Sequence, residues 1–287
     1  MPLAAAPIPL LHGLAEIAAD YEAAIVDVWG VLHNGVAPFP GAPEALAAFR
    51  RTGRPVVLLS NVPRPSAAID IQLGRLGVGR DAYDAIVTSG DLARRLVAAR
   101  CPAPLFHVGP ERDLLIFEGL DARLVGPDDA RHIICTGLFD DTRETAENYR
   151  DRLAALAGRG VPMVCANPDL TVERGGAIIY CAGALGALYE ELGGAVLYAG
   201  KPHPPVYDLA FEVLAGLAGR PVDRRRILAI GDGMRTDIAG AAAVGIPSLF
   251  VASPIHVTGT LTPDTLAHLF PPGAKARPVA ALDTLRW

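Results

Sequence analysis

Short apolar runs alternate with helical periods along most of the chain. Strands are predicted at 23–29, 55–60, 84–89, 195–200, 226–232 and 247–253, and helices at 41–53, 65–77, 91–101, 204–219 and 236–245. Strands that alternate with helices of this length form βαβ units, in which helices cover both faces of a parallel sheet. The pattern therefore predicts an α/β protein built on a parallel sheet.

The middle of the chain has strand and helix signals of its own. Strands are predicted at 103–109, 122–125, 132–137 and 161–169, the last of which runs into a turn, and the longest predicted helix spans 142–160. Because internal repeats, low-complexity tracts and a long linker are all absent from the sequence, composition alone does not mark the boundaries of a middle domain.

Composition and charge exclude several classes of protein. The chain has 287 residues, of which 51% are hydrophobic, so it can bury a sizeable core in up to two compact units. Its net charge of -5 argues against nucleic acid or an anionic membrane as the main partner. The cysteines form no CxxC pair and the histidines no paired spacing, so zinc is not expected. Without a long apolar run or a basic N-terminal region, the expected location is cytoplasmic.

Carboxylates, a hydroxyl, an amide and a lysine follow four of the predicted strands. They are Asp27, Ser60, Asn61, Lys201, Asp232 and Asp237. In an open parallel sheet, ligands bind beyond the carboxyl ends of the strands. A single Asp after a strand is usually a cap or turn residue, but four strand ends of this kind together indicate a functional site.

This set of residues suits phosphoryl transfer. Carboxylates together with a backbone carbonyl make a hard oxygen site for Mg2+, which neutralises phosphate charge. A carboxylate can also attack phosphorus to give an aspartyl phosphate, while a hydroxyl, backbone N–H groups and an ammonium hold the remaining oxygens. We therefore expect a Mg2+-dependent phosphatase that acts on a small phosphorylated metabolite.

Six segments, in order along about residues 27–255, resemble class IIA of the haloacid dehalogenase (HAD) superfamily, which includes NagD-like and 4-nitrophenylphosphatase-like enzymes. They are DVWGVLHNG (27–35), LLSNVPRP (58–65), VCANPD (164–169), YCAGALGALYEELGG (180–194), GKPHPPVYDLA (200–210) and GDGMRTDIAGA (231–241). The resemblance implies a Rossmann-like core of residues 1–101 and 196–287, with an inserted C2-type α/β cap at 102–195. The cap would recognise the substrate and exclude water on closing. A homodimer through the cap is common in similar proteins and is an expectation for this chain as well.

The resemblance also implies a role for each site residue. Asp27 is then the nucleophile, Asp237 orients metal-bound water or the loop, and Lys201 pairs with the nucleophile and the phosphate. The implied metal residues are Asp27, Trp29 through its backbone oxygen, Asp232 and Asp237; the catalytic residues are Asp27, Ser60 and Lys201; the substrate contacts are Trp29, Gly30, Ser60, Asn61, Asn167 and Lys201. A simple turn is an equally good interpretation of the Asn167-Pro168-Asp169 segment.

Trp29 departs from the family pattern, which normally has a second Asp at this place as the general acid and base. Indole N–H does not titrate usefully and cannot protonate a leaving oxygen. Three interpretations stay open. The substrate has a good leaving group, or another residue donates the proton, or the chain is a phosphometabolite-binding protein with vestigial activity. His33 is the nearest candidate donor in the sequence, although a role in the turn is the stronger interpretation of this residue. Metal-free dehalogenase chemistry is disfavoured because Asp232 and Asp237 would repel each other without a cation.

Overall fold

The computed structural model describes residues 6–174, 177–253, 257 and 259–287. The chain divides into two compact units. The first unit comprises Met1–Ser60, Ile69–Val87 and Tyr207–Trp287, and the second comprises Asn61–Ala68 and Thr88–Val206. Among the described residues, none of the helices combines the length and the apolar character that crossing a membrane demands.

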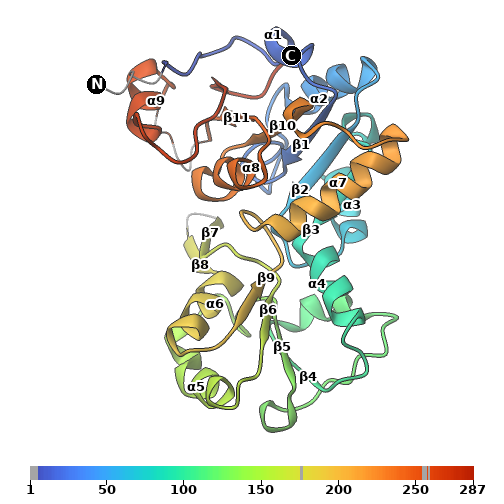
Figure 1. The fold of residues 1–287 in the computed structure, drawn as a ribbon, viewed down its shortest axis with the longest axis vertical. Coiled ribbons are helices and arrows are strands. Elements are labelled where there is room, and N and C mark those ends of the chain that lie inside the picture. The colour runs from blue at the N-terminus through green and yellow to red at the C-terminus, as the bar shows by residue number, and fades with distance from the viewer. Residues whose placement is uncertain (1–5, 175–176, 254–256, 258) are drawn as a thin grey trace. The chain divides into compact units, whose positions relative to one another are not determined.

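A six-stranded sheet in the order β12-β11-β10-β1-β2-β3 forms the centre of the first unit (Figure 1). The strands are β1 (Ala23–Asp27), β2 (Val56–Ser60), β3 (Ala85–Thr88), β10 (Ile227–Gly231), β11 (Ser248–Val251) and β12 (Ala280–Leu282). β1 pairs in parallel with both β2 and β10. Every residue of β1, β2 and β10 is buried, as expected for central strands of a parallel sheet covered on both faces.

Helices and short turns precede these strands or lie between them along the chain. They are α1 (Ala15–Ala18), α2 (Ala42–Arg51), α3 (Ser66–Arg75), α7 (Pro204–Ala218), a π-helical turn (Met234–Ile238), α8 (Ala239–Val244) and α9 (Pro263–Leu269). Leu46 and Phe49 of α2 are completely buried, which fixes its apolar face against the core. The π-helical turn begins three residues after β10 and positions part of the candidate site.

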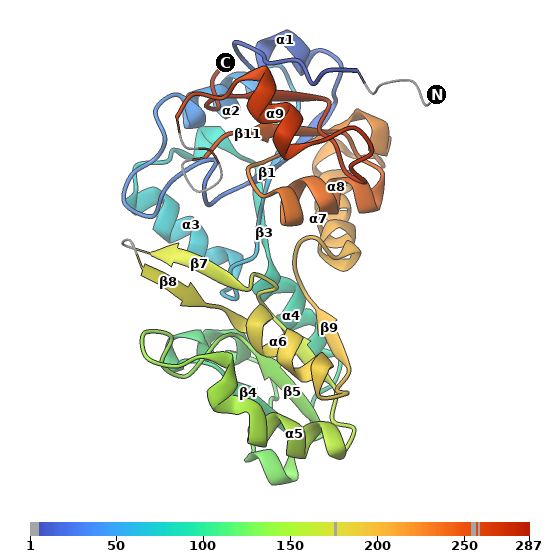
Figure 2. The same cartoon turned by 90° about the vertical axis from the view of Figure 1, so that its left-hand side faces the viewer.

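The second unit contains a parallel sheet in the order β4-β5-β6-β9 and an antiparallel hairpin, β7-β8 (Figure 2). The strands are β4 (Leu105–Val108), β5 (His132–Cys135), β6 (Met163–Cys165), β7 (Thr171–Arg174), β8 (Ala177–Tyr180) and β9 (Val196–Tyr198), and the helices are α4 (Ser89–Ala98), α5 (Arg150–Gly158) and α6 (Ala182–Glu191). Leu153 of α5 and Leu185 of α6 belong to the same buried cluster as Ile133 and Met163 of the sheet. In Figure 1, α5 and α6 lie on one side of this sheet and α4 on the other.

The prediction of an α/β fold with a Rossmann-like parallel sheet is confirmed. The predicted strand at 195–200, however, was wrongly grouped with the main sheet. β9 pairs with β6, with Met163 opposite Val196. An apolar run indicates that a strand exists but not which sheet it joins, because that choice depends on contacts far along the chain. The proposed cap boundaries at 102 and 195 stay a prediction.

Two predictions for the middle of the chain were wrong. The region 142–160 is not one long helix, because Thr145 and Asn148 form a capping box that starts a separate short turn before α5 begins at Arg150. α7, with 15 residues, is longer than α5. The predicted strand at 122–125 amounts to a single bridge between Leu105 and Leu124. The β7-β8 hairpin, α9 and β12 were not predicted, since each is short and has little periodicity.

Candidate active site

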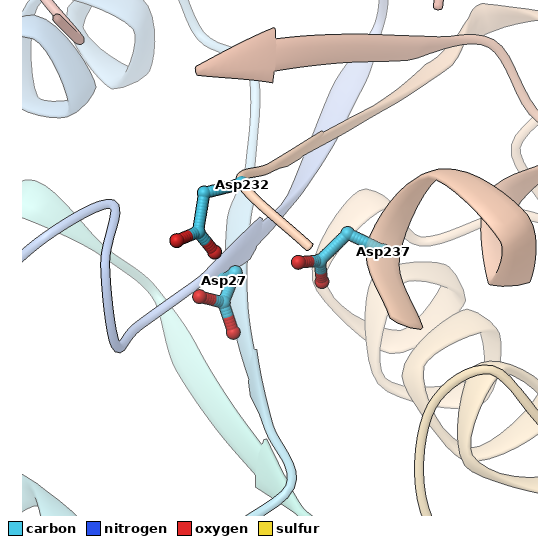
Figure 3. Close-up of side chains that lie close together, drawn as sticks. All are labelled: Asp27, Asp232 and Asp237. Atoms are coloured by element: carbon cyan, nitrogen blue, oxygen red, sulfur yellow. The ribbon is translucent and has the colours of Figure 1, made fainter. Parts of the chain in front are cut away.

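Three buried aspartates gather at the carboxyl ends of β1 and β10 in the first unit (Figure 3). Asp27 ends β1, Asp232 follows β10, and Asp237 lies in the π-helical turn. One carboxylate oxygen from each lies within 4.8 Å of the others. Like charges this close repel one another unless a cation lies among them, and carboxylate oxygens are the ligands that Mg2+ prefers. The donor set therefore fits a hard divalent cation.

Two glycines make room for these carboxylates. Gly30, in the loop after β1, has φ +91, and a Cβ there would lie 2.2 Å from Oδ2 of Asp232. Gly231, the last residue of β10, is equally tight, because its Cβ would lie 2.2 Å from the Cβ of Asp237. A side chain at either position would displace a carboxylate, and the positive φ at Gly30 adds backbone strain for any other residue. Gly30 was predicted only as a substrate contact, so its packing role was missed.

The carboxylate of Asp237 turns back toward its own loop. Its Oδ2 accepts a hydrogen bond of 2.9 Å from the N–H of Gly233. The N–H of Asp237 donates in return to the carbonyl of Gly233, at 2.9 Å. Tyr207 of α7 donates to the carbonyl of Asp237 at 3.5 Å. These contacts hold the loop after β10, and the role of Asp237 in orienting this loop or metal-bound water stays a prediction.

Ser60 is the last residue of β2 and is 8% exposed. The register of β1 and β2 pairs Asp27 with Leu59, which precedes Ser60. Adjacent parallel strands end at the same edge of a sheet, so the structure brings the predicted hydroxyl and the predicted nucleophile to one edge. The prediction that Ser60 contacts phosphate stays a prediction.

Trp29 forms part of a tight turn after β1. Its indole is half-buried and meets the imidazole of His33 edge-on, with ring centroids 5.5 Å apart. Gly35, at φ +87, lies against the indole so closely that a Cβ would come within 2.5 Å of the ring. The N–H of Gly30 donates to the carbonyl of His33 at 3.0 Å and closes the turn. The indole thus packs the turn together.

His33 is a poor substitute for the missing acid. It is 2% exposed, and its Nδ1 accepts a hydrogen bond of 2.9 Å from the N–H of Gly35. Burial lowers the pKa of His33 to about 4 because a charged imidazole is disfavoured away from water. At pH 7 the ring is therefore almost entirely neutral, and this geometry favours the turn role over that of proton donor.

In the second unit, Asn61, Lys201 and Asp169 meet through the carboxamide of Asn61. Oδ1 of Asn61 accepts from the N–H of Lys201 at 2.7 Å, and Nδ2 donates to the carbonyl of Lys201 and to Oδ1 of Asp169, both at 3.0 Å. Lys201 is 3% exposed. The predicted pairing of Asn61 with substrate stays a prediction, but its side chain already forms three hydrogen bonds to two residues of this unit.

Asn167 adopts the turn that the sequence allowed. It is 8% exposed, and its Oδ1 accepts from the N–H of Asp169 at 3.1 Å. A side-chain oxygen bonded to the backbone two residues on is an Asx turn, which shapes a loop without any ligand. The role of Asn167 as a substrate contact stays a prediction.

Sequence reasoning missed two residues that pack these loops, Ser89 and Gly200. A Cβ at Gly200 would lie 2.1 Å from Oγ of Ser89 and 2.5 Å from Oδ1 of Asn61. The signal available was the glycine directly before Lys201, which indicates a close approach of backbone to other groups. Nothing in the sequence around Ser89 indicated which loop it would touch.

Comparison with known proteins gives the same family. A model of haloacid dehalogenase-like hydrolases matches residues 24–123, and a HAD-hydrolase-like model matches residues 198–286. A crystal structure of a haloacid dehalogenase-like family hydrolase from Brucella suis 1330 has 43% identity and a TM-score of 0.84, and the match covers 96% of this chain and 99% of that chain. The chain belongs to the haloacid dehalogenase-like hydrolase family.

Named relatives in this family are phosphatases. D-glycerol 3-phosphate phosphatase of Mycobacterium tuberculosis is 31% identical over 252 residues, which cover 85% of this chain and 66% of that protein. Ribonucleotide monophosphatase NagD of Escherichia coli K12 is 27% identical, with 80% of this chain and 86% of that protein covered. The prediction of a NagD-like, HAD-type phosphoric monoester hydrolase is confirmed.

The same fold has been solved with the predicted cofactor in a relative. A structure of glycerol phosphate phosphatase from Mycobacterium tuberculosis in complex with magnesium has a TM-score of 0.69 and 23% identity, and the match covers 92% of this chain and 76% of that chain. At this identity the likeness shows the fold, and magnesium is a property of that protein.

Proposed function

We propose that the chain is a Mg2+-dependent phosphatase that hydrolyses a small phosphorylated metabolite through an aspartyl phosphate on Asp27. The observation that carries the proposal is the convergence of three buried carboxylates within 4.8 Å at the ends of two neighbouring parallel strands. The residues that would hold Mg2+ are Asp27, Asp232, Asp237 and the backbone oxygen of Trp29. The ion would neutralise the charge of the bound phosphate.

The chain's own residues supply the covalent chemistry. A carboxylate oxygen of Asp27 forms a bond to phosphorus while the ester P–O bond breaks, and the leaving oxygen departs with the electron pair. Water then attacks phosphorus while the P–O bond to Asp27 breaks; the protons of the water leave with inorganic phosphate or pass to solvent, and the carboxylate of Asp27 is regenerated. Ser60 and Lys201 are proposed to hold the phosphate oxygens, the first by its hydroxyl and the second by its ammonium group.

The direct test is replacement of the proposed nucleophile. Asp27→Asn keeps the shape of the side chain but removes its nucleophilic oxygen, so turnover of 4-nitrophenyl phosphate should fall by about 10⁴-fold or more. Asp20→Asn, at an exposed aspartate of the same unit, is the matched control and should leave kcat unchanged. Circular dichroism checks that both variants fold. Undiminished, Mg2+-dependent turnover by Asp27→Asn would contradict the proposal.

A phosphometabolite-binding protein with slow turnover is the second candidate. It is favoured by Trp29 at the position of the general acid and by the low pKa of His33, about 4, which leaves this turn without an acid at pH 7. A panel of phosphate esters with Mg2+ separates the two candidates. Release of phosphate supports the phosphatase, whereas a raised melting temperature without release supports binding. A homodimer formed through the cap stays a prediction, for which light scattering is the test.

A further inference from the structure

One carboxamide joins three loops of the second unit. The loops are the segment that begins at Asn61, the turn that contains Asp169 after β6, and the turn that contains Lys201 after β9. The side chain of Asn61 lies among them and is 6% exposed. Its partners Asp169 and Lys201 are 108 and 140 residues away along the chain, so the contact joins segments that no local interaction would bring together.

The hydrogen bonds of Asn61 form a closed pair with the main chain of one residue. The N–H of Lys201 donates to Oδ1 at 2.7 Å, and the carbonyl of Lys201 accepts from Nδ2 at 3.0 Å. The two contacts need opposite ends of the amide, so only one orientation of the group satisfies both. The two bonds hold the two peptide groups that flank the Cα of Lys201, so they fix the position and the orientation of this Cα together.

Asp169 holds the carboxamide in this orientation. Its Oδ1 accepts the second hydrogen of Nδ2 at 3.0 Å, and a bond to a carboxylate is stronger than a bond between neutral groups. Oγ of Ser89 lies 3.4 Å from Oδ1 on the other side. Aspartate in place of Asn61 would lack the donors and would face the carboxylate of Asp169, so asparagine matches this place chemically.

We propose that Asn61 is a positioning residue for Lys201, and that its side chain acts on the reaction by fixing the main chain of Lys201. This inference rests on the proposed function, in which the ammonium of Lys201 holds the phosphate. A lysine side chain has four rotatable bonds, so the position of its ammonium depends on a firmly held starting point at the main chain. Small misplacements of a group that orients a substrate reduce rates strongly.

A double-mutant cycle tests whether Asn61 acts through Lys201. The four proteins are the wild type, Asn61→Ala, Lys201→Ala and the double variant, assayed for kcat/KM with 4-nitrophenyl phosphate and for the Kd of inorganic phosphate with Mg2+ by calorimetry. Asn61→Ala should lower kcat/KM by roughly 10- to 100-fold and weaken phosphate binding. In the Lys201→Ala background the same change should cost less than about two-fold, because the group that it positions is already absent.

A control and a milder variant guard against a simple loss of folding. Asn148→Ala also removes a side-chain bond to backbone in this unit, where Oδ1 accepts from the N–H of Thr145 at 2.8 Å, and it should leave kcat/KM unchanged. Asp169→Ala keeps the Asn61–Lys201 pair but removes the acceptor that orients it. Its effect should be smaller than that of Asn61→Ala and should also vanish in the Lys201→Ala background.

Each outcome decides a separate point. Equal losses from Asn61→Ala in both backgrounds would show a contribution independent of Lys201 and overturn the inference, as would wild-type kcat/KM in Asn61→Ala. If Lys201→Ala alone keeps full activity and phosphate affinity, the proposed role of Lys201 is wrong and the inference fails with it. When Lys201→Ala turns over too slowly to measure, the phosphate Kd values complete the cycle, and Asp169→Ala replaces Asn61→Ala if that variant does not fold.

Discussion

In the first unit three carboxylate oxygens gather within 4.8 Å of one another, whereas in the second unit one neutral carboxamide joins the main chain of Lys201 to Asp169. The first arrangement places like charges together in a buried place, which is unfavourable until a cation arrives. The second satisfies its polar groups internally and needs no ligand. Removing the metal ion should therefore lower the stability and the activity that depend on the three aspartates. The contacts of Asn61 should instead be disturbed by substitutions that change the size of a neighbouring side chain.

Metal removal should have the largest effect on activity, and this effect should come from the aspartate cluster rather than from the contacts of Asn61. Treatment with EDTA should reduce turnover of 4-nitrophenyl phosphate to background, and Mg2+ should restore it, because the carboxylates of Asp27 and Asp232 need a cation among them. Without metal, Asp232→Asn should raise the melting temperature by a few degrees, since it removes one of three mutually repelling charges. Full activity in EDTA on a haloacid would instead support dehalogenase chemistry.

Leaving-group acidity should have the next largest effect. Because Trp29 cannot protonate a leaving oxygen, an aryl phosphate should be cleaved far faster than an alkyl phosphate. A positioned acid contributes roughly 10²–10⁴-fold, and this deficit should fall mainly on the alkyl substrate. Trp29→Asp should recover part of the alkyl rate, although loss of the indole leaves a gap beside Gly35 that relaxes the turn.

The comparison of kcat/KM for 4-nitrophenyl phosphate and a simple alkyl phosphate, in wild type and Trp29→Asp, is the measurement. Equal rates for both esters in the wild type, with chemistry rate-limiting, would mean that another donor exists. His33→Gln would then be the first variant to make, despite the lowered pKa of His33.

The sequence predicted the carboxylate cluster better than the loop contacts. Asp27 and Asp232 could be placed because the first ends a buried strand and the second directly follows one, and parallel strands end at one edge of a sheet. The bond from Asn61 to Lys201 could not be predicted, since it spans 140 residues and depends on the exact paths of separate loops. β9 was grouped with the wrong sheet for the same reason, and the predicted helix at 142–160 was too long because the capping box at Thr145 was overlooked.

Gly200→Ala should test the close packing of the loops, with a smaller effect. The added Cβ would lie 2.1 Å from Oγ of Ser89 and 2.5 Å from Oδ1 of Asn61, so the loops must move apart. Overpacking of this kind lowers the free energy of unfolding by about 1–3 kcal/mol. Both the melting temperature and kcat/KM should therefore fall. Gly216→Ala in α7, where a Cβ meets nothing within 4 Å, is the control and should raise the melting temperature slightly. Equal melting temperatures for both variants would contradict the tight packing.

The smallest expected effect is on the pH dependence of stability. It concerns His107, Thr136 and Asp113, a polar cluster of the second unit that takes no part in the proposed reaction. Nε2 of His107 is 2.9 Å from Oγ1 of Thr136, and the ring meets Phe117 edge-on. Burial lowers the pKa of His107 to about 4. Burial also raises the pKa of Asp113, which shares Thr136 as a hydrogen-bond partner, despite the opposing effects of Arg112 and Arg64.

The signs of these two shifts are opposite. Below pH 6.5 the unfolded chain takes up a proton on His107 that the folded protein refuses, so stability falls as the pH drops from 6.5 toward 4. The folded protein holds a proton on Asp113 more tightly than the unfolded chain does, so Asp113 partly offsets this loss. His107→Gln should therefore reduce the fall in melting temperature between pH 7 and pH 5, by the equivalent of about 1–2 kcal/mol. Asp113→Asn should have the opposite sign, and stability should fall more steeply once the pH drops into the range in which folded Asp113 takes up its proton. Thermal unfolding at both pH values measures this, and a His107→Gln variant with an unchanged pH dependence would mean that the imidazole is charged in the folded protein.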